Sequence, residues 1–225
     1  MTYDHIRQAV FLDRPNRFIA HIELDGERQV CHVKNTGRCR ELLIPGAQVL
    51  VQLCDSPARK TKYDLISVWK EDRLINMDAA APNVVFREWL ESGGLGGPER
   101  IRPECRHGDS RFDFYIERAG RPAFCEVKGV TLESDGVARF PDAPTLRGVK
   151  HLYGLIRCVE EGYDAVAAFI IQMSEVRWFT PASELHPAFA QALRAAADAG
   201  VQILALDCDV TETTIRARQA VEVRL

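Results

Sequence analysis

Short runs in which apolar and polar residues alternate fill much of the first 91 residues of the chain. A period of two is typical of strands that bury one face. Turn signals such as Asp25-Gly26 and Pro45-Gly46 separate these runs. The pattern predicts a small sandwich or barrel, and five strands fit an OB-type barrel. The expected strands are residues 17–24, 29–33, 48–53, 65–69 and 73–76.

A glycine-rich segment, residues 92–98, follows a short helix that we expect at residues 83–91. Dense glycine between two patterned regions is typical of a flexible linker. We therefore predict an N-terminal domain over residues 1–91 and a second domain over residues 92–225, joined at about 92–98. A wide glycine loop inside a single domain is the alternative.

Beyond the glycines, strand-like runs give way to alternating helices and strands. Residues 146–161 carry apolar side chains at helical spacing, with Thr145 as the N-cap and Gly162 just after the last turn. Residues 165–172 are almost continuously apolar, which is typical of a buried central strand. The pattern predicts a mixed sheet covered by helices, so that the fold class is α/β, or α+β with the barrel included. The other expected elements are strands at 101–105, 111–117, 123–130 and 202–206 and an alanine-rich helix that ends at Gly200.

Composition describes an ordinary globular protein, with 46% hydrophobic and 27% charged residues. No apolar run approaches the length of about 18 residues that a membrane span needs, and the first residues lack the apolar stretch of a signal peptide. The seven cysteines are scattered and include no C-x-x-C pair. We therefore expect free thiols in the cytoplasm and neither a disulfide framework nor a zinc site.

Basic residues gather in two stretches of the N-terminal half, although the net charge of the whole chain is −3. Residues 28–40 and 59–62 contain basic side chains and no acidic ones. Such stripes can follow a phosphate backbone, so we expect DNA as a partner; solvated strand edges are the alternative. The candidate nucleic-acid-binding residues here are Arg28, Lys34, Arg38, Arg40, Arg59, Lys60 and Lys62.

The sharpest candidate chemistry lies on two expected strands of the second domain. Glu126 and Lys128 are two residues apart, so they point to the same face of a strand. Asp113 lies on the preceding strand between Phe112 and Phe114, which we expect to share the opposite, apolar face. If the strands pair, the two carboxylates and the lysine converge. Carboxylate oxygens suit Mg²⁺ or Mn²⁺, and a nearby lysine can hold a phosphate or orient a water.

Four further residues are candidates for the same site. Glu104, on the strand before Asp113, is a possible third carboxylate ligand. Arg147, Lys150 and His151 lie at the start of the expected helix, where the helix N-terminus favours a bound phosphate. A histidine considered alone is more often packed or on the surface than catalytic. An E-x-K spacing also arises by chance, so Glu126 and Lys128 can be a simple charge pair.

Four stretches together resemble the sugar fermentation stimulation protein family. They are N-T-G at 35–37, S-R-F-D-F at 110–114, C-E-V-K-G-V-T-L at 125–132 and F-P-D-A-P-T-L-R-G-V-K-H-L at 140–152. The resemblance implies an OB-type domain followed by a PD-(D/E)XK nuclease-like domain, DNA binding, and a role in regulating sugar metabolism in bacteria. It also implies that Asp113, Glu126 and Lys128 fill the nuclease motif, with Phe112 in place of its proline.

Two functions of different class follow. In the first, Asp113 and Glu126, with the Val127 carbonyl and Glu104, hold Mg²⁺ or Mn²⁺ for DNA cleavage, and Lys128 acts on the attacking water. In the second, the chain is a DNA-binding regulator, and exposed aromatic residues of the barrel stack on bases. The candidate aromatic residues are Phe18, Tyr63 and Trp69, for which core packing is the alternative.

Other outcomes stay open at this point. The carboxylates can hold a metal for stability only, and RNA, a nucleotide or another phosphate compound can be the ligand. A homo-oligomer would not be surprising, because nuclease-like domains that cut both strands often work as pairs.

Overall fold

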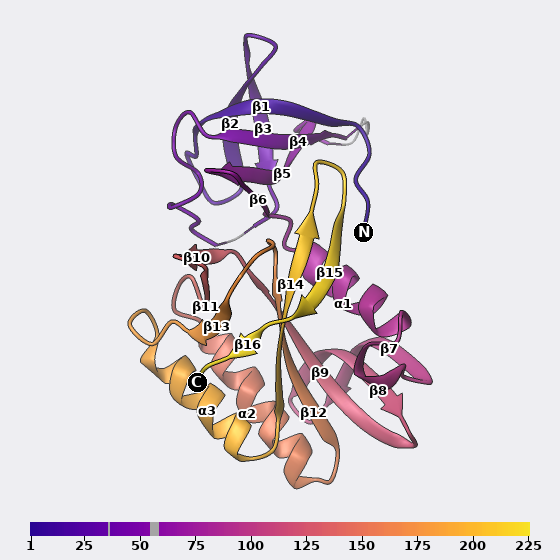
Figure 1. Ribbon diagram of the computed structural model, residues 1–225. Coiled ribbons are helices and arrows are strands. Elements are labelled where there is room, and N and C mark those ends of the chain that lie inside the picture. The colour runs from indigo at the N-terminus through magenta and orange to yellow at the C-terminus, as the bar shows by residue number, and fades with distance from the viewer. Residues whose placement is uncertain (36, 55–58) are drawn as a thin grey trace.

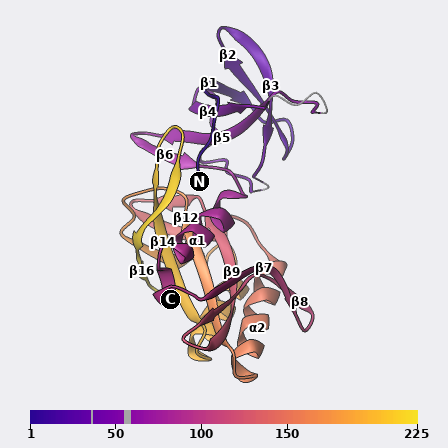
Figure 2. The ribbon, with the colours of Figure 1, turned by 90° about the vertical axis from the view of Figure 1, so that its right-hand side faces the viewer.

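The computed structural model describes residues 1–35, 37–54 and 59–225, which form a β-barrel standing on one end of a helix-flanked sheet (Figures 1 and 2). Thr36 of the N-T-G stretch lies outside the described residues. So do Asp55–Pro57, which form a turn signal between two expected strands. The description below concerns the remaining residues.

The barrel contains five strands in the order β3-β2-β1-β4-β5, and pairing between β3 and β5 closes it. Its OB-like architecture agrees with the prediction, but the identity of the strands differs. The first strand, β1, was missed, and the expected fifth strand, β6, pairs with β5 outside the closed ring. The strands are β1 (Ile6–Asp13), β2 (Ile19–Leu24), β3 (Glu27–Val33), β4 (Gln48–Leu53), β5 (Tyr63–Lys70) and β6 (Arg73–Asn76).

The second part is built on a six-stranded mixed sheet in the order β15-β14-β12-β9-β8-β7. The predicted apolar central strand is confirmed as β12, which pairs in parallel with both β9 and β14. The strands are β7 (Arg100–His107), β8 (Ser110–Arg118), β9 (Arg121–Val130), β12 (Asp164–Ile171), β14 (Gln202–Val210) and β15 (Ile215–Ala220). A smaller sheet contains β10 (Leu132–Ser134), β11 (Val137–Phe140), β13 (Trp178–Pro181) and β16 (Glu222–Val223).

Helices cover both faces of the larger sheet. The helix α1 (Ala81–Glu91) packs on one face, and α2 (Leu146–Glu160) and α3 (Pro187–Asp198) lie on the other (Figure 1). The N-cap of α2 is as predicted, because the Thr145 hydroxyl accepts a hydrogen bond from the Gly148 amide at 3.0 Å. The start of α2, where candidate basic residues lie, is therefore fixed in place. No helix of the described chain is long and apolar enough to cross a membrane.

The boundary between the two parts lies earlier in the chain than residues 92–98, where the glycine-rich segment led us to expect it. Phe86 of α1 packs against Phe114 of the larger sheet, with ring centroids 5.6 Å apart. The helix α1 therefore belongs to the second part of the chain, although we had predicted that it belongs to the N-terminal domain. Residues 92–98 join α1 to β7 through a short turn at Gly94–Gly96, so they are not the link between the two parts. The chain crosses from the barrel between β6 and α1.

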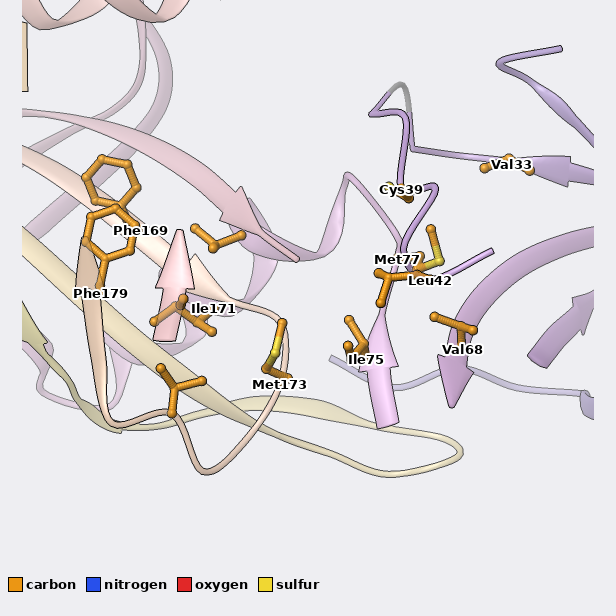
Figure 3. Close-up of a cluster of buried hydrophobic side chains, with 14 of the residues drawn as sticks. Val33, Cys39, Leu42, Val68, Ile75, Met77, Phe169, Ile171, Met173 and Phe179 are labelled. Atoms are coloured by element: carbon orange, nitrogen blue, oxygen red, sulfur yellow. The ribbon is translucent and has the colours of Figure 1, made fainter. Parts of the chain in front are cut away.

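The two parts share a continuous apolar core (Figure 3). Leu42 and Met77 from the barrel side and Ile171 and Met173 from the sheet side belong to one cluster of buried residues. Polar contacts reinforce this junction, because the buried Gln172 amide donates to the Asn76 side chain at 2.9 Å. The hairpin of β14 and β15 also extends alongside the base of the barrel (Figures 1 and 2). The barrel is thus held against the sheet over several separate contacts.

Candidate functional site

The candidate carboxylates lie where β8 and β9 diverge. The pairing between these strands runs as far as Phe114 opposite Cys125. Beyond this pair, the Val127 amide donates to the Asp113 carboxylate at 2.8 Å. A side chain thus takes the place that a backbone carbonyl has in a regular ladder. Asp113 is therefore positioned by the backbone of the strand that carries Glu126.

The strand β8 changes face at Asp113, which differs from the expected arrangement. Phe112 packs on the α2 side against Phe124, with ring centroids 5.4 Å apart. Phe114 packs on the α1 side, and so does Ile116. The prediction that Phe112 and Phe114 share one apolar face is therefore wrong. The divergence of the strands changes the alternation at this point, and strict alternation was the basis of that prediction.

Glu126 is at the centre of the cluster and is only 3% exposed. Its Oε1 atom contacts both the Lys128 ammonium and Nδ1 of His151 on α2. Its Oε2 atom is buried and has no hydrogen-bond partner among the described residues. A buried carboxylate oxygen without a partner is costly. This atom is therefore a candidate position for a ligand of positive charge.

The two carboxylates have opposite pKa shifts. Burial, and then the nearby charge of Glu126, raise the pKa of Asp113 above its usual range. Burial would also raise the pKa of Glu126, but hydrogen bonds from His151 and Lys128 outweigh burial and lower it. Glu126 is therefore anionic at neutral pH. A cation between the two carboxylates would stabilise both in the charged form.

Glu104 is near this cluster in register but its side chain does not join it. Its backbone lies between the pairs of Pro103 with Phe114 and Cys105 with Phe112, and is thus opposite Asp113. The Glu104 side chain is 69% exposed and pairs instead with Arg111 at 3.3 Å. The described residues contain no group of three or more acidic, histidine or cysteine side chains arranged to hold a metal. Only two carboxylates are brought together.

The three basic candidates of α2 separate into two groups. His151 contacts Glu126, and Arg147 lies beside His151 with its Nε atom 3.4 Å from Nε2 of the ring. Lys150 points elsewhere and pairs with Asp109 at 3.3 Å. His151 was predicted to contact nucleic acid, and the structure places it behind Glu126 as a buried residue that is 7% exposed.

Asn83 is a member of the site that sequence reasoning missed. Its side-chain amide donates to Asp113 at 3.1 Å from the first turn of α1. Pro82, the preceding residue, is a signal for the first turn of a helix. No spacing rule, however, connects that turn with an aspartate 30 residues later. The contact arises because α1 packs on the sheet that carries Asp113.

The predicted basic residues of the barrel divide into those that pair with acids and those that do not. Three of them form ion pairs: Arg28 with Asp13, Lys34 with Asp78 and Arg59 with Asp64. Arg38 and Arg40 are exposed and line a hollow on the barrel. Lys60 and Lys62 are also exposed but do not line that hollow.

The aromatic candidates also separate. Phe18 is 53% exposed on the barrel, so core packing does not apply to it. Tyr63 is partly buried against the apolar core, and Trp69 has intermediate exposure. Phe18 alone therefore offers a largely accessible ring.

Comparison with known proteins matches both parts of the chain. The N-terminal OB domain of the family model covers residues 12–77, and the "sugar fermentation stimulation protein RE domain" covers residues 80–214. The break between the two matches coincides with the connection from β6 to α1. A sugar fermentation stimulation protein homolog of Desulfitobacterium hafniense (strain DSM 10664 / DCB-2) is 57% identical, over 100% of this chain and 99% of the relative. One of Clostridium beijerinckii is 53% identical over 100% of both chains.

A solved structure agrees with these sequence matches. It is described as that of Pyrococcus furiosus SfsA in complex with Ca²⁺. The likeness has a TM-score of 0.90 at 29% identity and covers 100% of this chain and 98% of that one. The whole length of the chain is therefore accounted for by the comparisons, and the chain belongs to the sugar fermentation stimulation protein family.

Proposed function

We propose that the chain binds DNA and hydrolyses phosphodiester bonds with the help of a divalent cation held by Asp113 and Glu126. The observation that carries this proposal is the buried Oε2 atom of Glu126, which has no partner among the described residues and lies in a cluster with a second carboxylate. A structural charge pair would not need a second acid, because Lys128 and His151 already contact the other oxygen of Glu126.

The donor set fits a hard divalent cation. Asp113 and Glu126 offer carboxylate oxygens, which Mg²⁺, Mn²⁺ and Ca²⁺ prefer. The raised pKa of Asp113 has the like charge of Glu126 among its causes, and a bound cation would relieve this repulsion. The Ca²⁺ complex of the similar Pyrococcus furiosus protein supports the same type of ligand. The Val127 carbonyl remains a further candidate ligand, whereas Glu104 would first have to leave Arg111. A bound cation would neutralise charge on the scissile phosphate and lower the pKa of a water.

The other residues have roles that follow from their contacts. Lys128 lies on the same face as Glu126 and is partly exposed, so its ammonium can orient a water or a phosphate oxygen. His151 holds Oε1 of Glu126 from α2, which fixes the orientation of that carboxylate. Arg147 is exposed at the start of the same helix and can pair with a phosphate of the DNA.

A second candidate function is a DNA-binding regulator of sugar metabolism that retains this surface without turnover. The side chain of Glu104 favours this alternative, because it leaves the cluster with only two carboxylates in the described part of the chain. In that case, the site binds the phosphate backbone of DNA without cleaving it, and the bound cation only positions the DNA.

A cleavage assay separates the two functions. Purified protein is incubated with end-labelled single- and double-stranded DNA in Mg²⁺, Mn²⁺ or EDTA. We expect product only with the metal, and none from Asp113→Asn or Glu126→Gln. The control is Asp25→Asn, the same chemical change at an exposed aspartate on a barrel turn. DNA binding that is equal in EDTA, with no product at high protein concentration, would establish the regulator instead.

A further inference from the structure

The barrel carries a hollow of about 420 Å³ whose walls differ in character. Leu43 and Pro45 contribute apolar surface. Three arginines, Arg17, Arg38 and Arg40, contribute positive charge. The volume lies within the range of about 300–1,000 Å³ that is typical of ligand sites. The hollow can therefore accept a ligand that is flat and apolar on one side and anionic on the other.

A half-buried arginine that also lines the hollow, Arg14, gives the hollow its shape. The guanidinium of Arg14 donates to four backbone carbonyls, those of Arg17, Asn35, Gly37 and Arg38, at 2.7 to 2.9 Å. These bonds tie the loop after β1 to the loop after β3. The backbone that carries the side chains of Arg17 and Arg38 is therefore already held in position before a ligand binds. This reduces the entropy cost of binding.

The positive charge of the hollow is not neutralised by the protein. Arg17, Arg38 and Arg40 are exposed, and none forms an ion pair within the described ranges. Asp13 also lines the hollow, but its carboxylate accepts from Arg28 at 2.9 Å and contacts His21 at 2.6 Å. These arginines thus differ from Arg28, Lys34 and Arg59, which have acidic partners.

An accessible aromatic ring adjoins the same loop. Phe18 directly follows Arg17 and is 53% exposed. Its backbone is fixed, because the Asn16 side chain accepts from the Phe18 amide at 2.9 Å. An unpaired base can stack on such a ring, whereas the bases of a duplex are stacked on one another and are not available.

A second hollow adjoins the first and reaches β9, the strand that carries Glu126 and Lys128. Gly37 lines the first hollow and also lines the second, which has a volume of about 170 Å³ and lies at the junction of the two parts. Gly129, the residue after Lys128 on β9, lines the second hollow as well. A Cβ atom at position 37 would collide with the Asp142 carboxylate, so glycine lets this side chain lie close to the backbone of the loop after β3. The cationic hollow and the candidate catalytic strand are therefore connected through a single residue.

We propose that the hollow formed by Arg17, Arg38, Arg40, Leu43 and Pro45 binds an unpaired segment of DNA, with Phe18 as a stacking ring, and directs that strand toward Lys128. The inference rests on the proposed function in that it takes DNA as the substrate. It adds that the substrate contains a single-stranded stretch. It assigns binding to Arg38 and Arg40 among the predicted basic residues and adds Arg17, which the sequence did not single out.

The test measures binding of a fluorescein-labelled 20-nucleotide oligo-dT and of a blunt hairpin duplex in EDTA, as a function of salt. The variant is Arg38→Glu with Arg40→Glu. Lys60→Glu with Lys62→Glu is the matched control, since it changes the charge by the same amount at exposed positions outside the hollow. Phe18→Ala tests stacking alone. Circular dichroism and the urea midpoint establish that each variant is folded.

We expect oligo-dT to bind more tightly than the duplex, and the Arg38/Arg40 variant to lose at least about tenfold in affinity. Its salt slope should fall by about 1.4, for two lost phosphate contacts at roughly 0.7 each. Phe18→Ala should lose about fivefold to tenfold, which is within the range of one base stack. The Lys60/Lys62 control should lose less than threefold.

Equal losses in both double variants, or tighter binding of the duplex, would overturn the assignment of the hollow. These results are independent of cleavage. Metal-dependent cleavage of blunt duplex with the hollow variant unimpaired would reject this inference and retain the nuclease. Selective loss of oligo-dT binding in a protein that never cleaves would retain the inference and reject the nuclease.

Discussion

Removal of the Glu133 carboxylate, on β10 of the smaller sheet, should weaken the junction between the barrel and the second part of the chain. This side chain is 6% exposed and interacts with two barrel residues, Lys70 at 2.9 Å and Arg73 at 3.0 Å. It also accepts from the Gly136 amide at 2.6 Å. Loss of one partner of a fully buried pair costs about 3–5 kcal/mol. Because the side chains of Lys70 and Arg73 are 28% and 22% exposed, water partly replaces the lost partner. We therefore expect about 2–3 kcal/mol for Glu133→Ala.

Urea unfolding at pH 7 measures this effect. With a slope of about 3 kcal/mol per molar urea, the midpoint should fall by roughly 0.7–1 M. Glu222→Ala is the control, because its pair with Arg224 is exposed, with Glu222 at 58%, and its midpoint should not change measurably. The reasoning would be refuted if Glu133→Ala unfolded at the same urea concentration as the control.

The same pair has a pH signature. Burial would raise the pKa of Glu133, but the hydrogen bond from Lys70 and the other contacts outweigh burial and lower it. A carboxyl with a lowered pKa in the folded state stabilises the protein above its unfolded pKa, and that contribution is lost as the pH falls through the folded pKa. The stability difference between wild type and Glu133→Gln should be constant from about pH 6 to 8 and shrink below about pH 4.3. A difference that grows toward acid would contradict this.

Two further predictions concern packing. Phe112→Ala should destabilise the fold by about 3–5 kcal/mol because Phe112 is 1% exposed. Phe18→Ala should leave the urea midpoint nearly unchanged because Phe18 is 53% exposed. Similar losses of stability in both variants would contradict the assigned burial. Gly129→Ala should destabilise by about 1–3 kcal/mol, because its Cβ atom would lie 2.5 Å from Gln172 and 2.7 Å from Pro82; an unchanged midpoint would mean that this junction yields more easily than the structure indicates.

Periodicity was sufficient for elements whose burial is uniform along their length. The central strand β12 and the helix α2 were predicted nearly to their observed ends, because a continuous apolar run and an N-cap at Thr145 are local signals. The strand β1 was missed because its first half is polar and exposed, at Arg7 and Gln8. Its position in the barrel depends on backbone pairing with β2 and β4, and side-chain pattern does not report such pairing.

The boundary between the two parts was misplaced for a different reason. Glycine marks where the backbone turns, and both a linker and a tight turn need that freedom. Which of the two occurs depends on where α1 packs. Phe86 and Leu90 are buried against the second part. The sequence before the glycines shows that these residues are apolar but not which surface they pack against.

The candidate site could be predicted only in part: Asp113, Glu126 and Lys128 lie together, whereas Glu104 and Lys150 pair with residues outside the cluster. The E-x-K spacing correctly placed Glu126 and Lys128 on one face, since Lys128 contacts the glutamate. The rule that successive side chains of a strand alternate between faces gave the wrong arrangement around Asp113. The strands β8 and β9 diverge there, and no sequence pattern indicates such a divergence. Asn83 was not foreseen, and His151 was expected to bind a phosphate and not to hold Glu126. Both residues come from helices, and only tertiary packing brings those helices to the sheet.

The most direct test of the central claim is cation binding by the metal-free protein, measured by isothermal titration calorimetry with Mn²⁺. We predict one site in wild type and in Asp25→Asn, and loss of that site in both Asp113→Asn and Glu126→Gln. Cleavage of labelled DNA, followed on the same samples, should appear with the cation and disappear with either variant. Binding of Mn²⁺ that is equal in all four proteins, with no cleavage, would contradict the account.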